Sequence, residues 1–314
     1  MNKRRILYAA IAVALAAAIV FALLTVLREG SEGILYRVTG NGATAYLLGS
    51  IHIGTAEMHP FGDTLEEAMA ASDTFVFESD TVSQASLQRL AERQLLPDGG
   101  SLEAILGTAL YGDVAAAYQK LGLSTASLDT KQPWVAINTL AVYSSAEEMG
   151  VKNVRRAISL GVEDTVQAYA GKHGKSLAYL ETMDEVADTM ESFSDALTRT
   201  LLQDEIDIVL GRKSTTDLET VNRWPLWWRD GDAETFRDFY RQSFETGDLA
   251  LYAEYEDKLV SRRNALMADR LDALMQNGGT YFVTVGLLHL VADADSILTR
   301  LQAMGYSVEK IGQP

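Results

Sequence analysis

Two segments of the same form stand near opposite ends of this chain, each an apolar strand followed by glycine, two further residues and histidine. The first ends at residues 49–52 and the second at residues 286–289. In open α/β sheets, ligands bind beyond the carboxyl ends of the strands. A glycine at that point lets the chain turn sharply and lets another group approach the backbone. We therefore expect both strands to lie in one sheet and to present His52 and His289 to a shared point.

A third polar residue, Glu78, follows the apolar residues 74–77 and stands where that strand leaves the core. Neutral imidazole is a common ligand for zinc, manganese, cobalt and iron. Two histidines and one carboxylate form a metal set used by hydrolases, with open positions for water and substrate. The pattern predicts that His52, Glu78 and His289 bind one divalent metal ion. Glu78 is then either a ligand or the general base.

Strands and helices alternate at both ends of the body. Residues 34–38 and 45–48 are predicted to be strands around an Asn41-Gly42 turn, which is a strong hairpin signal. Further elements are expected as a helix at 63–71 with Asp63 as its N-cap, a long helix at 251–275, a buried strand at 280–285, a helix at 293–304 and strands at 176–180 and 306–311. The residues between about 83 and 248 are mostly amphipathic helix broken by glycines.

These elements predict an α/β fold with a central mixed β-sheet and a helical cap. The expected domains are an N-terminal membrane anchor at residues 1–28 and a catalytic domain at 34–311, with its helical insertion at about 83–248. Of the remaining histidines, His59 is expected at the surface or behind the site, and His173 in a solvated turn. The tryptophans of residues 224–228 are expected to pack in the core or the cap, or else to line a peptide groove.

The N-terminus contains an uncharged apolar run of 22 residues, at positions 6–27. That length crosses a hydrocarbon core of roughly 30 Å. Lys3, Arg4 and Arg5 precede the run, so the positive-inside rule predicts a cytoplasmic N-terminus and an extracytoplasmic body. The alternatives are a cleaved signal peptide, whose apolar region is usually shorter, and a buried soluble helix. We predict a single-pass transmembrane helix that anchors the protein in the cell membrane.

The net charge of −16 limits the partners of the chain. So acidic a protein repels phosphate backbones, which makes nucleic acid a poor partner. It also repels anionic lipid, so contact with the membrane is expected through the N-terminal helix alone. The sequence contains no cysteine, which excludes disulfides, thiolate metal sites and cysteine nucleophiles.

Three stretches of the sequence resemble the TraB/GumN family, which includes the TIKI metalloproteases. Residues 47–80 are similar to the family's opening, residues 161–182 to its middle block, and residues 262–311 to its ending with an Arg-Asn pair and the second Gly-x-x-His. The resemblance implies a fold like that of the TIKI, erythromycin esterase and ChaN-like proteins. It also implies peptidase activity with manganese or cobalt, zinc being a further option, on a peptide or protein substrate.

The resemblance assigns roles to particular residues of this sequence. His52, Glu78 and His289 match the family's two histidines and its glutamate, and would be the metal and catalytic residues. Four further residues match positions that would complete the catalytic site, namely Glu163, Glu181, Arg263 and Asn264. Glu163 stands where the family often has aspartate. The positive charge of Arg263 has two interpretations. It could stabilise a developing oxyanion or hold a substrate carboxylate, or it could form a salt bridge along a charged helix.

The predicted function is metal-assisted hydrolysis of a peptide bond in extracytoplasmic peptides or protein N-termini. Two other functions are compatible with the same residues. One is a membrane protein that captures a peptide pheromone without cutting it, and the other is an esterase-like hydrolase that uses histidine and glutamate without metal.

Overall fold

The computed structural model describes residues 30–212, 223–245, 248–292 and 295–312. Six strands form one sheet in the order β4-β3-β5-β2-β1-β6. In chain order, the strands are β1 (Leu35–Gly40), β2 (Ala43–Ser50), β3 (Thr74–Ser79), β4 (Ser176–Glu181), β5 (Gly279–Gly286) and β6 (Ser307–Ile311). Strands β4, β3, β5 and β2 are mutually parallel, and β1 runs antiparallel to both β2 and β6. The predicted mixed sheet of an α/β fold is confirmed.

The hairpin that joins β1 to β2 follows the predicted turn chemistry. Asn41 has φ of 53° and Gly42 has φ of 74°. Positive φ at both central residues is the requirement of the tight hairpin turn whose twist matches that of the strands. The turn fixes the register of β1 against β2. On its other side β2 pairs with β5, and its last residue, Ser50, lies opposite Gly286.

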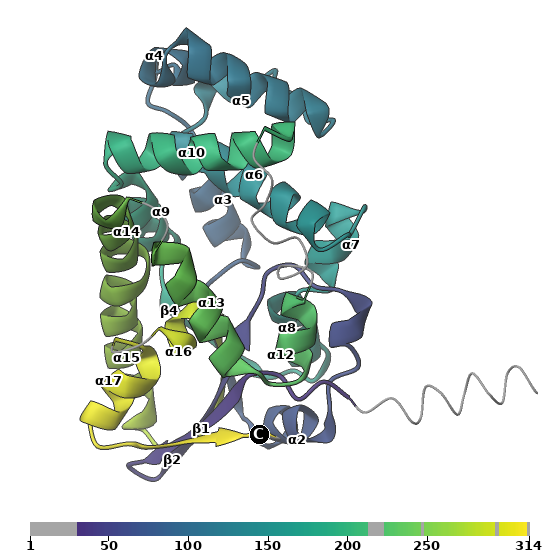
Figure 1. Cartoon of the computed structure of the whole chain (residues 1–314). Helices are drawn as coiled ribbons and strands as arrows, with labels where there is room; N and C mark the ends of the chain where they lie inside the picture. The colour runs from purple at the N-terminus through teal and green to yellow at the C-terminus, as the bar shows by residue number, and fades with distance from the viewer. Residues whose placement is uncertain (1–29, 213–222, 246–247, 293–294, 313–314) are drawn as a thin grey trace, which may run out of the picture.

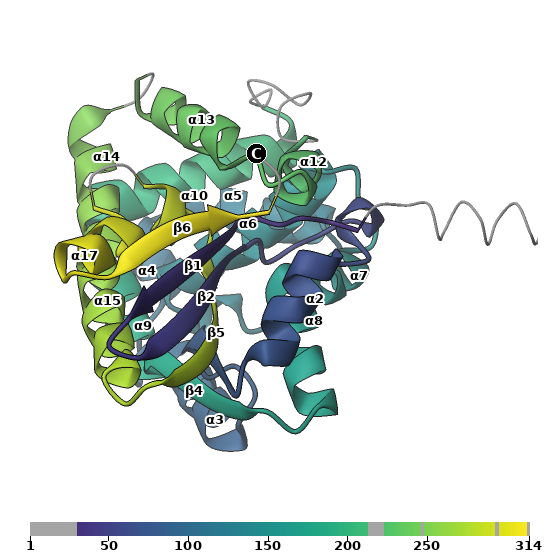
Figure 2. The same ribbon diagram turned by 90° about the horizontal axis from the view of Figure 1, so that it is seen from below.

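Helices cover both faces of the sheet and form a cap beyond its edge. Against the sheet, α2 and α8 lie on one side and α15 and α17 on the other (Figure 2). The cap helices α4, α5 and α10 lie at the end of the molecule remote from β1 and β6 (Figure 1). The helices are α2 (Asp63–Ala71), α3 (Gln84–Arg93), α4 (Leu102–Leu106), α5 (Thr108–Lys120), α6 (Pro133–Glu148), α7 (Val154–Ser159), α8 (Val162–Lys172), α9 (Met183–Glu191), α10 (Asp195–Leu210), α12 (Trp224–Arg229), α13 (Ala233–Glu245), α14 (Leu249–Tyr255), α15 (Arg262–Met275), α16 (Leu288–Val291) and α17 (Ile297–Ala303).

Three expectations about individual elements need correction. Asp63 is the first residue of α2, and the N-cap is Gly62, which offers no side chain to the helix. The predicted long helix is interrupted by a π-helical segment, η3 (Glu256–Ser261), which joins α14 to α15. The last helix is shorter than expected because Ser296 caps it, accepting a hydrogen bond from the Thr299 backbone N–H.

The predicted membrane anchor lies outside the described residues and stays a prediction. From residue 30 onward, none of the helices that the structure describes is both long enough and apolar enough to cross a bilayer.

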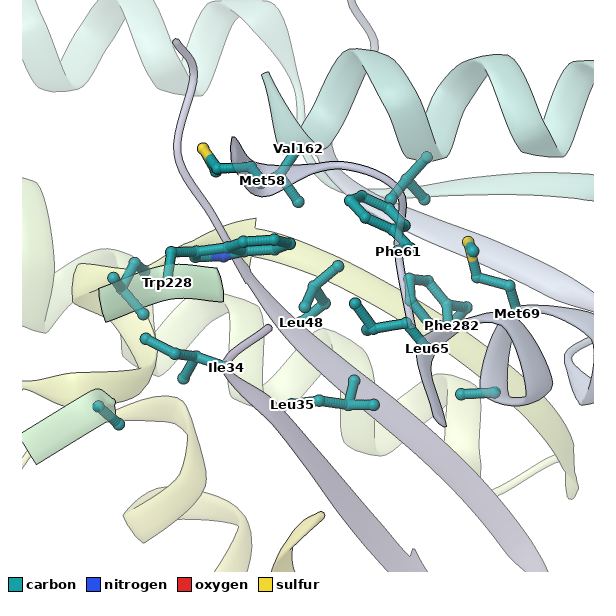
Figure 3. Close-up of a cluster of buried hydrophobic side chains, with 14 of the residues drawn as sticks. Ile34, Leu35, Leu48, Met58, Phe61, Leu65, Met69, Val162, Trp228 and Phe282 are labelled. Atoms are coloured by element: carbon teal, nitrogen blue, oxygen red, sulfur yellow. The ribbon is translucent and has the colours of Figure 1, made fainter. Parts of the chain in front are cut away.

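Trp228 of α12 lies at the centre of the core on the α2 side of the sheet (Figure 3). Its side chain is 0% exposed, and its Nε1 donates a hydrogen bond to the Gly49 carbonyl oxygen at 2.7 Å. It therefore attaches α12 to the end of β2, at the glycine of the first Gly-x-x-His.

Replacing this side chain should cost the protein much of its stability. We expect Trp228→Ala to lower the free energy of unfolding by about 3–5 kcal/mol, because it leaves a cavity and an unpaired carbonyl. Leu249→Ala serves as control, since Leu249 is 70% exposed. Urea unfolding monitored by circular dichroism measures both variants. Equal midpoints for the two would contradict the central place of Trp228.

Candidate active site

The four parallel strands end at one edge of the sheet, and each delivers one polar side chain there. Glu78 is the penultimate residue of β3 and Glu181 the last residue of β4. His52 follows β2 by two residues, and His289 lies in α16, three residues beyond β5. Parallel strands bring their carboxyl ends together, so residues far apart in sequence meet at this edge.

A pocket of about 490 Å³ opens at this edge of the sheet. Its polar lining contains four of the residues expected from the sequence, namely His52, Glu78, Arg263 and His289. Most of the remaining lining, the aromatic wall, is aromatic or aliphatic. It is formed by Met190, Trp224, Phe236, Phe239, Tyr240, Tyr255, Leu259 and Val260. A pocket of this size, mostly apolar and with a few convergent polar groups, is typical of a ligand site.

The ring of His289 is held in one orientation by Asn264. Its Nδ1 lies 2.6 Å from Asn264 Oδ1, and the amide nitrogen of Asn264 donates to the Asp295 carbonyl oxygen at 2.6 Å. The amide oxygen can only accept, so Nδ1 carries the proton and Nε2 presents its lone pair to the pocket. Burial lowers the pKa of His289 to about 4, so the ring is neutral at physiological pH.

Glu78 and Glu181 share one guanidinium group. Arg263 Nη2 lies 2.9 Å from Glu78 Oε2 and 2.5 Å from Glu181 Oε2, and Arg263 Nη1 lies 3.2 Å from His289 Nε2. Burial opposes the ionisation of Glu78. His289 and Arg263, with a hydrogen bond from the Gly286 backbone N–H, nevertheless lower its pKa to about 2. For Glu181, burial dominates and raises the pKa. Two carboxylates on one cation leave an excess negative charge in a buried site.

Gly286 leaves room for Glu78 to approach the backbone. A Cβ at this position would lie 3.0 Å from Glu78 Oε1 and would press on the carboxylate that the backbone N–H binds. The glycine of the second Gly-x-x-His therefore has the predicted use, the close approach of another group to the chain.

His52 has a partner of its own, Glu163. Its Nδ1 lies 3.1 Å from Glu163 Oε2, and this hydrogen bond raises the pKa of His52. The contact depends on Gly161, because a Cβ at that position would lie 2.4 Å from the His52 carbonyl oxygen. The start of α8 can therefore pack on the backbone of the first Gly-x-x-His. The His52 side chain is 72% exposed, in contrast to the buried His289.

The predicted residues thus form two groups within one region. His289, Glu78, Arg263, Glu181 and Asn264 make a continuous network, and His52 with Glu163 forms a separate pair beside it. His289 Nε2 and Glu78 Oε1 are 3.6 Å apart. Within the part of the chain that the structure describes, no three histidine or acidic side chains are grouped closely enough to hold a metal ion.

Apart from Trp224, for which the lining of a groove was one of two expectations, the aromatic wall of the pocket was not predicted from the sequence. Phe236, Phe239 and Tyr240 recur at helical spacing on α13, a pattern that indicates a buried face but not a pocket. Tyr255 stands where α14 passes into η3, and burial raises its pKa to about 12. Trp224, the first of the clustered tryptophans, also lines the pocket, whereas Trp227 and Trp228 are core residues.

The two other histidines take no part in the pocket. His59 Nε2 lies 3.0 Å from the Leu160 carbonyl oxygen, and its ring stacks on Phe61. His173 is exposed and stacks on Tyr169. The predicted turn position of His173 is confirmed.

The tautomer of His289 can be tested directly by nuclear magnetic resonance. In metal-free protein, we expect His289 to remain neutral, with its proton on Nδ1, until the pH falls to about 4. In the unfolded chain the pKa returns to about 6.5, so the unfolded state takes up the proton first. This group therefore lowers stability as the pH falls from about 6.5 to about 4. Asn264→Ala should yield a mixture of tautomers in nitrogen-15 spectra, and a single unchanged tautomer would refute the role of Asn264.

The sequence of this chain matches the model of one protein family. A sequence model described as the TraB/PrgY/gumN family matches residues 34–310. No curated protein and no solved structure matches the chain. The match covers both Gly-x-x-His segments, Glu78 and the Arg-Asn pair, and it agrees with the resemblance of the sequence to this family. This chain belongs to the TraB/PrgY/gumN family.

Proposed function

We propose that the protein is a metal-dependent hydrolase that cleaves peptide bonds outside the cytoplasm, held at the membrane by residues 1–28. The observation that carries this proposal is the neutral ring of His289. Asn264 fixes its tautomer so that Nε2 offers a lone pair beside the ionised Glu78. A histidine oriented by an acceptor on its other nitrogen is the usual arrangement of a metal ligand.

Distance and charge both suit a cation between these two groups. His289 Nε2 lies 3.6 Å from Glu78 Oε1, so the two atoms are close enough to be donors to one ion. The carboxylates of Glu78 and Glu181 exceed the single charge of Arg263, which favours a further positive charge. Manganese or cobalt is the proposed ion, and zinc suits the same donors.

The third donor is proposed to be His52. Glu163 binds its Nδ1, which leaves Nε2 for an ion, as Asn264 does for His289. His52 lines the same pocket as Glu78 and His289, and its side chain is 72% exposed, so burial does not oppose a turn of the ring toward Glu78. Such a turn must keep Nδ1 within reach of Glu163 or give up that hydrogen bond. Binding of the ion must also displace the contact between Arg263 and His289 Nε2.

A bound divalent ion would lower the pKa of a water molecule and polarise the scissile carbonyl. Glu78 would act as a ligand or as the base that removes the proton from that water. Arg263, once freed from His289, would donate to the oxygen on which negative charge develops. Glu181 holds the guanidinium group from behind, and the aromatic wall excludes water and accommodates an apolar side chain of the substrate.

A peptide-library digest tests the proposal. The full-length protein in detergent should cleave peptides with manganese present, lose activity on chelation, and regain it when manganese is restored. Cleavage that survives exhaustive chelation would instead favour a metal-independent esterase-like hydrolase. Peptide binding without cleavage at saturating manganese would favour a sequestering protein.

A further inference from the structure

A second cavity, of about 360 Å³, lies in the helical cap. The N-terminal ends of α6 and α10 and the C-terminal end of α9 form its walls. Its lining includes Trp134, Met190, Phe193 and Thr198, and also the acidic residues Glu191 and Asp195.

This cavity adjoins the pocket at the sheet edge. Met190 lines both of them. Phe193 in the cap cavity contacts Tyr255 of the pocket, with ring centroids 6.4 Å apart. The boundary between the two spaces is therefore a few side chains. Met190 is unbranched and flexible, so it can move aside for a ligand at low cost.

The pocket at the sheet edge and the cap cavity are each lined by one tryptophan whose indole N–H has no hydrogen-bond acceptor among the described residues. The two donors are the buried Nε1 atoms of Trp224 and Trp134. Trp134 as a whole is 7% exposed. A buried donor without an acceptor is costly and uncommon in folded proteins. By contrast, the indole of Trp228 donates to a backbone carbonyl oxygen within the core.

The start of α6 also lacks acceptors of its own. Its N-cap, Gln132, makes no side-chain capping hydrogen bond, and no acidic residue stands in the first turn. The cap cavity thus combines unpaired donors with the carboxylates of Glu191 and Asp195. A ligand that suits it carries both acceptors and donors, and an extended peptide has one backbone carbonyl and one backbone N–H per residue.

We infer that the substrate is an extended peptide that occupies both spaces and passes over Met190. This inference rests on the proposed function, because it takes the pocket at the sheet edge to hold the scissile bond. The segment remote from that bond lies in the cap cavity, where a backbone carbonyl accepts from Trp134. A second carbonyl, nearer the reacting bond, accepts from Trp224. A dipeptide would fill the pocket and leave the cap cavity empty.

Binding to a full-length Glu78→Gln variant tests this without any need for cleavage. Two fluorescent peptides of the same apolar sequence are compared, one of about two residues and one of about eight, which extends over about 26 Å. The long peptide should bind at least about tenfold more tightly. Adding Trp134→Phe removes the N–H and keeps an aromatic ring. It should reduce the affinity advantage of the long peptide about fivefold. Tyr111→Phe, a conservative change on α5 away from both spaces, should leave that advantage intact.

Met190→Trp provides a second variant should Trp134→Phe disturb the fold. It narrows the boundary and should weaken the long peptide more than the short one. Equal affinities for the two lengths, or an affinity advantage insensitive to both changes, would overturn the extended site. If the wild-type protein binds the long peptide in this way but cleaves neither, the hydrolase proposal fails and the extended site stands. If it cleaves both peptides equally well, the hydrolase proposal stands and the extended site fails.

Discussion

The double variant His52→Ala, His289→Ala should hydrolyse peptides at nearly the same low rate as either single variant. Each single variant is expected to lower kcat/KM by about a thousandfold or more. Residues that act as one unit are strongly non-additive, so the second loss removes little that remains. The two histidines are 237 positions apart in the sequence, yet they line the same pocket.

Steady-state rates on one peptide, at saturating manganese, measure this effect. His59→Ala is the matched control, because His59 lies outside the pocket and should leave the rate near that of the wild type. Circular dichroism checks that each variant is folded. Two losses that multiply would mean that His52 and His289 serve independent sites.

Replacing Arg263 by methionine should both destabilise the protein and abolish its activity. The Arg263 side chain is 11% exposed and contacts Glu78 and Glu181 at once. Removing one partner of a buried ion pair typically costs about 3–5 kcal/mol, because the remaining charge is buried without compensation. Here two carboxylates lose their cation in one substitution.

The loss should depend on pH in a particular direction. Without Arg263, burial and mutual repulsion raise the pKa values of Glu78 and Glu181 above those of the unfolded chain. The variant is then least stable when both are ionised and recovers stability as the pH falls through the raised values. Urea unfolding at about pH 5 and about pH 8 should show a smaller deficit at the lower pH.

Two further variants separate charge from packing in this experiment. Adding Glu181→Gln to Arg263→Met removes one uncompensated charge and should restore part of the lost stability. Arg270→Met is the matched control, since Arg270 pairs with Glu185 at 2.6 Å but is 36% exposed. A loss for Arg270→Met as large as that for Arg263→Met would show that burial of the ion pair is not the cause.

Part of this site could be predicted because it depends on local pattern. An apolar strand followed by Gly-x-x-His points to His52 and to His289, and an apolar strand that ends directly in a glutamate points to Glu78. The hairpin could also be predicted from the sequence, because Asn41-Gly42 determines its turn. These features require only neighbours in the chain.

Other parts depend on contacts that no local pattern encodes. Arg263 is 82 positions from Glu181, and a π-helical segment directly precedes the helix that carries it. The sequence predicts a continuous helix around Arg263, where a salt bridge along that helix is equally reasonable. The pairing of His52 with Glu163 arises from the packing of α8 on the first Gly-x-x-His, which the sequence does not indicate.

Metal content tests the central claim most directly. After equilibrium dialysis against manganese, the wild-type chain should retain about one ion, and His52→Ala, Glu78→Ala and His289→Ala should each retain far less. His59→Ala should retain as much as the wild type. If His289→Ala keeps its full metal content, the ion is not held at the end of β5, and the site proposed here is wrong.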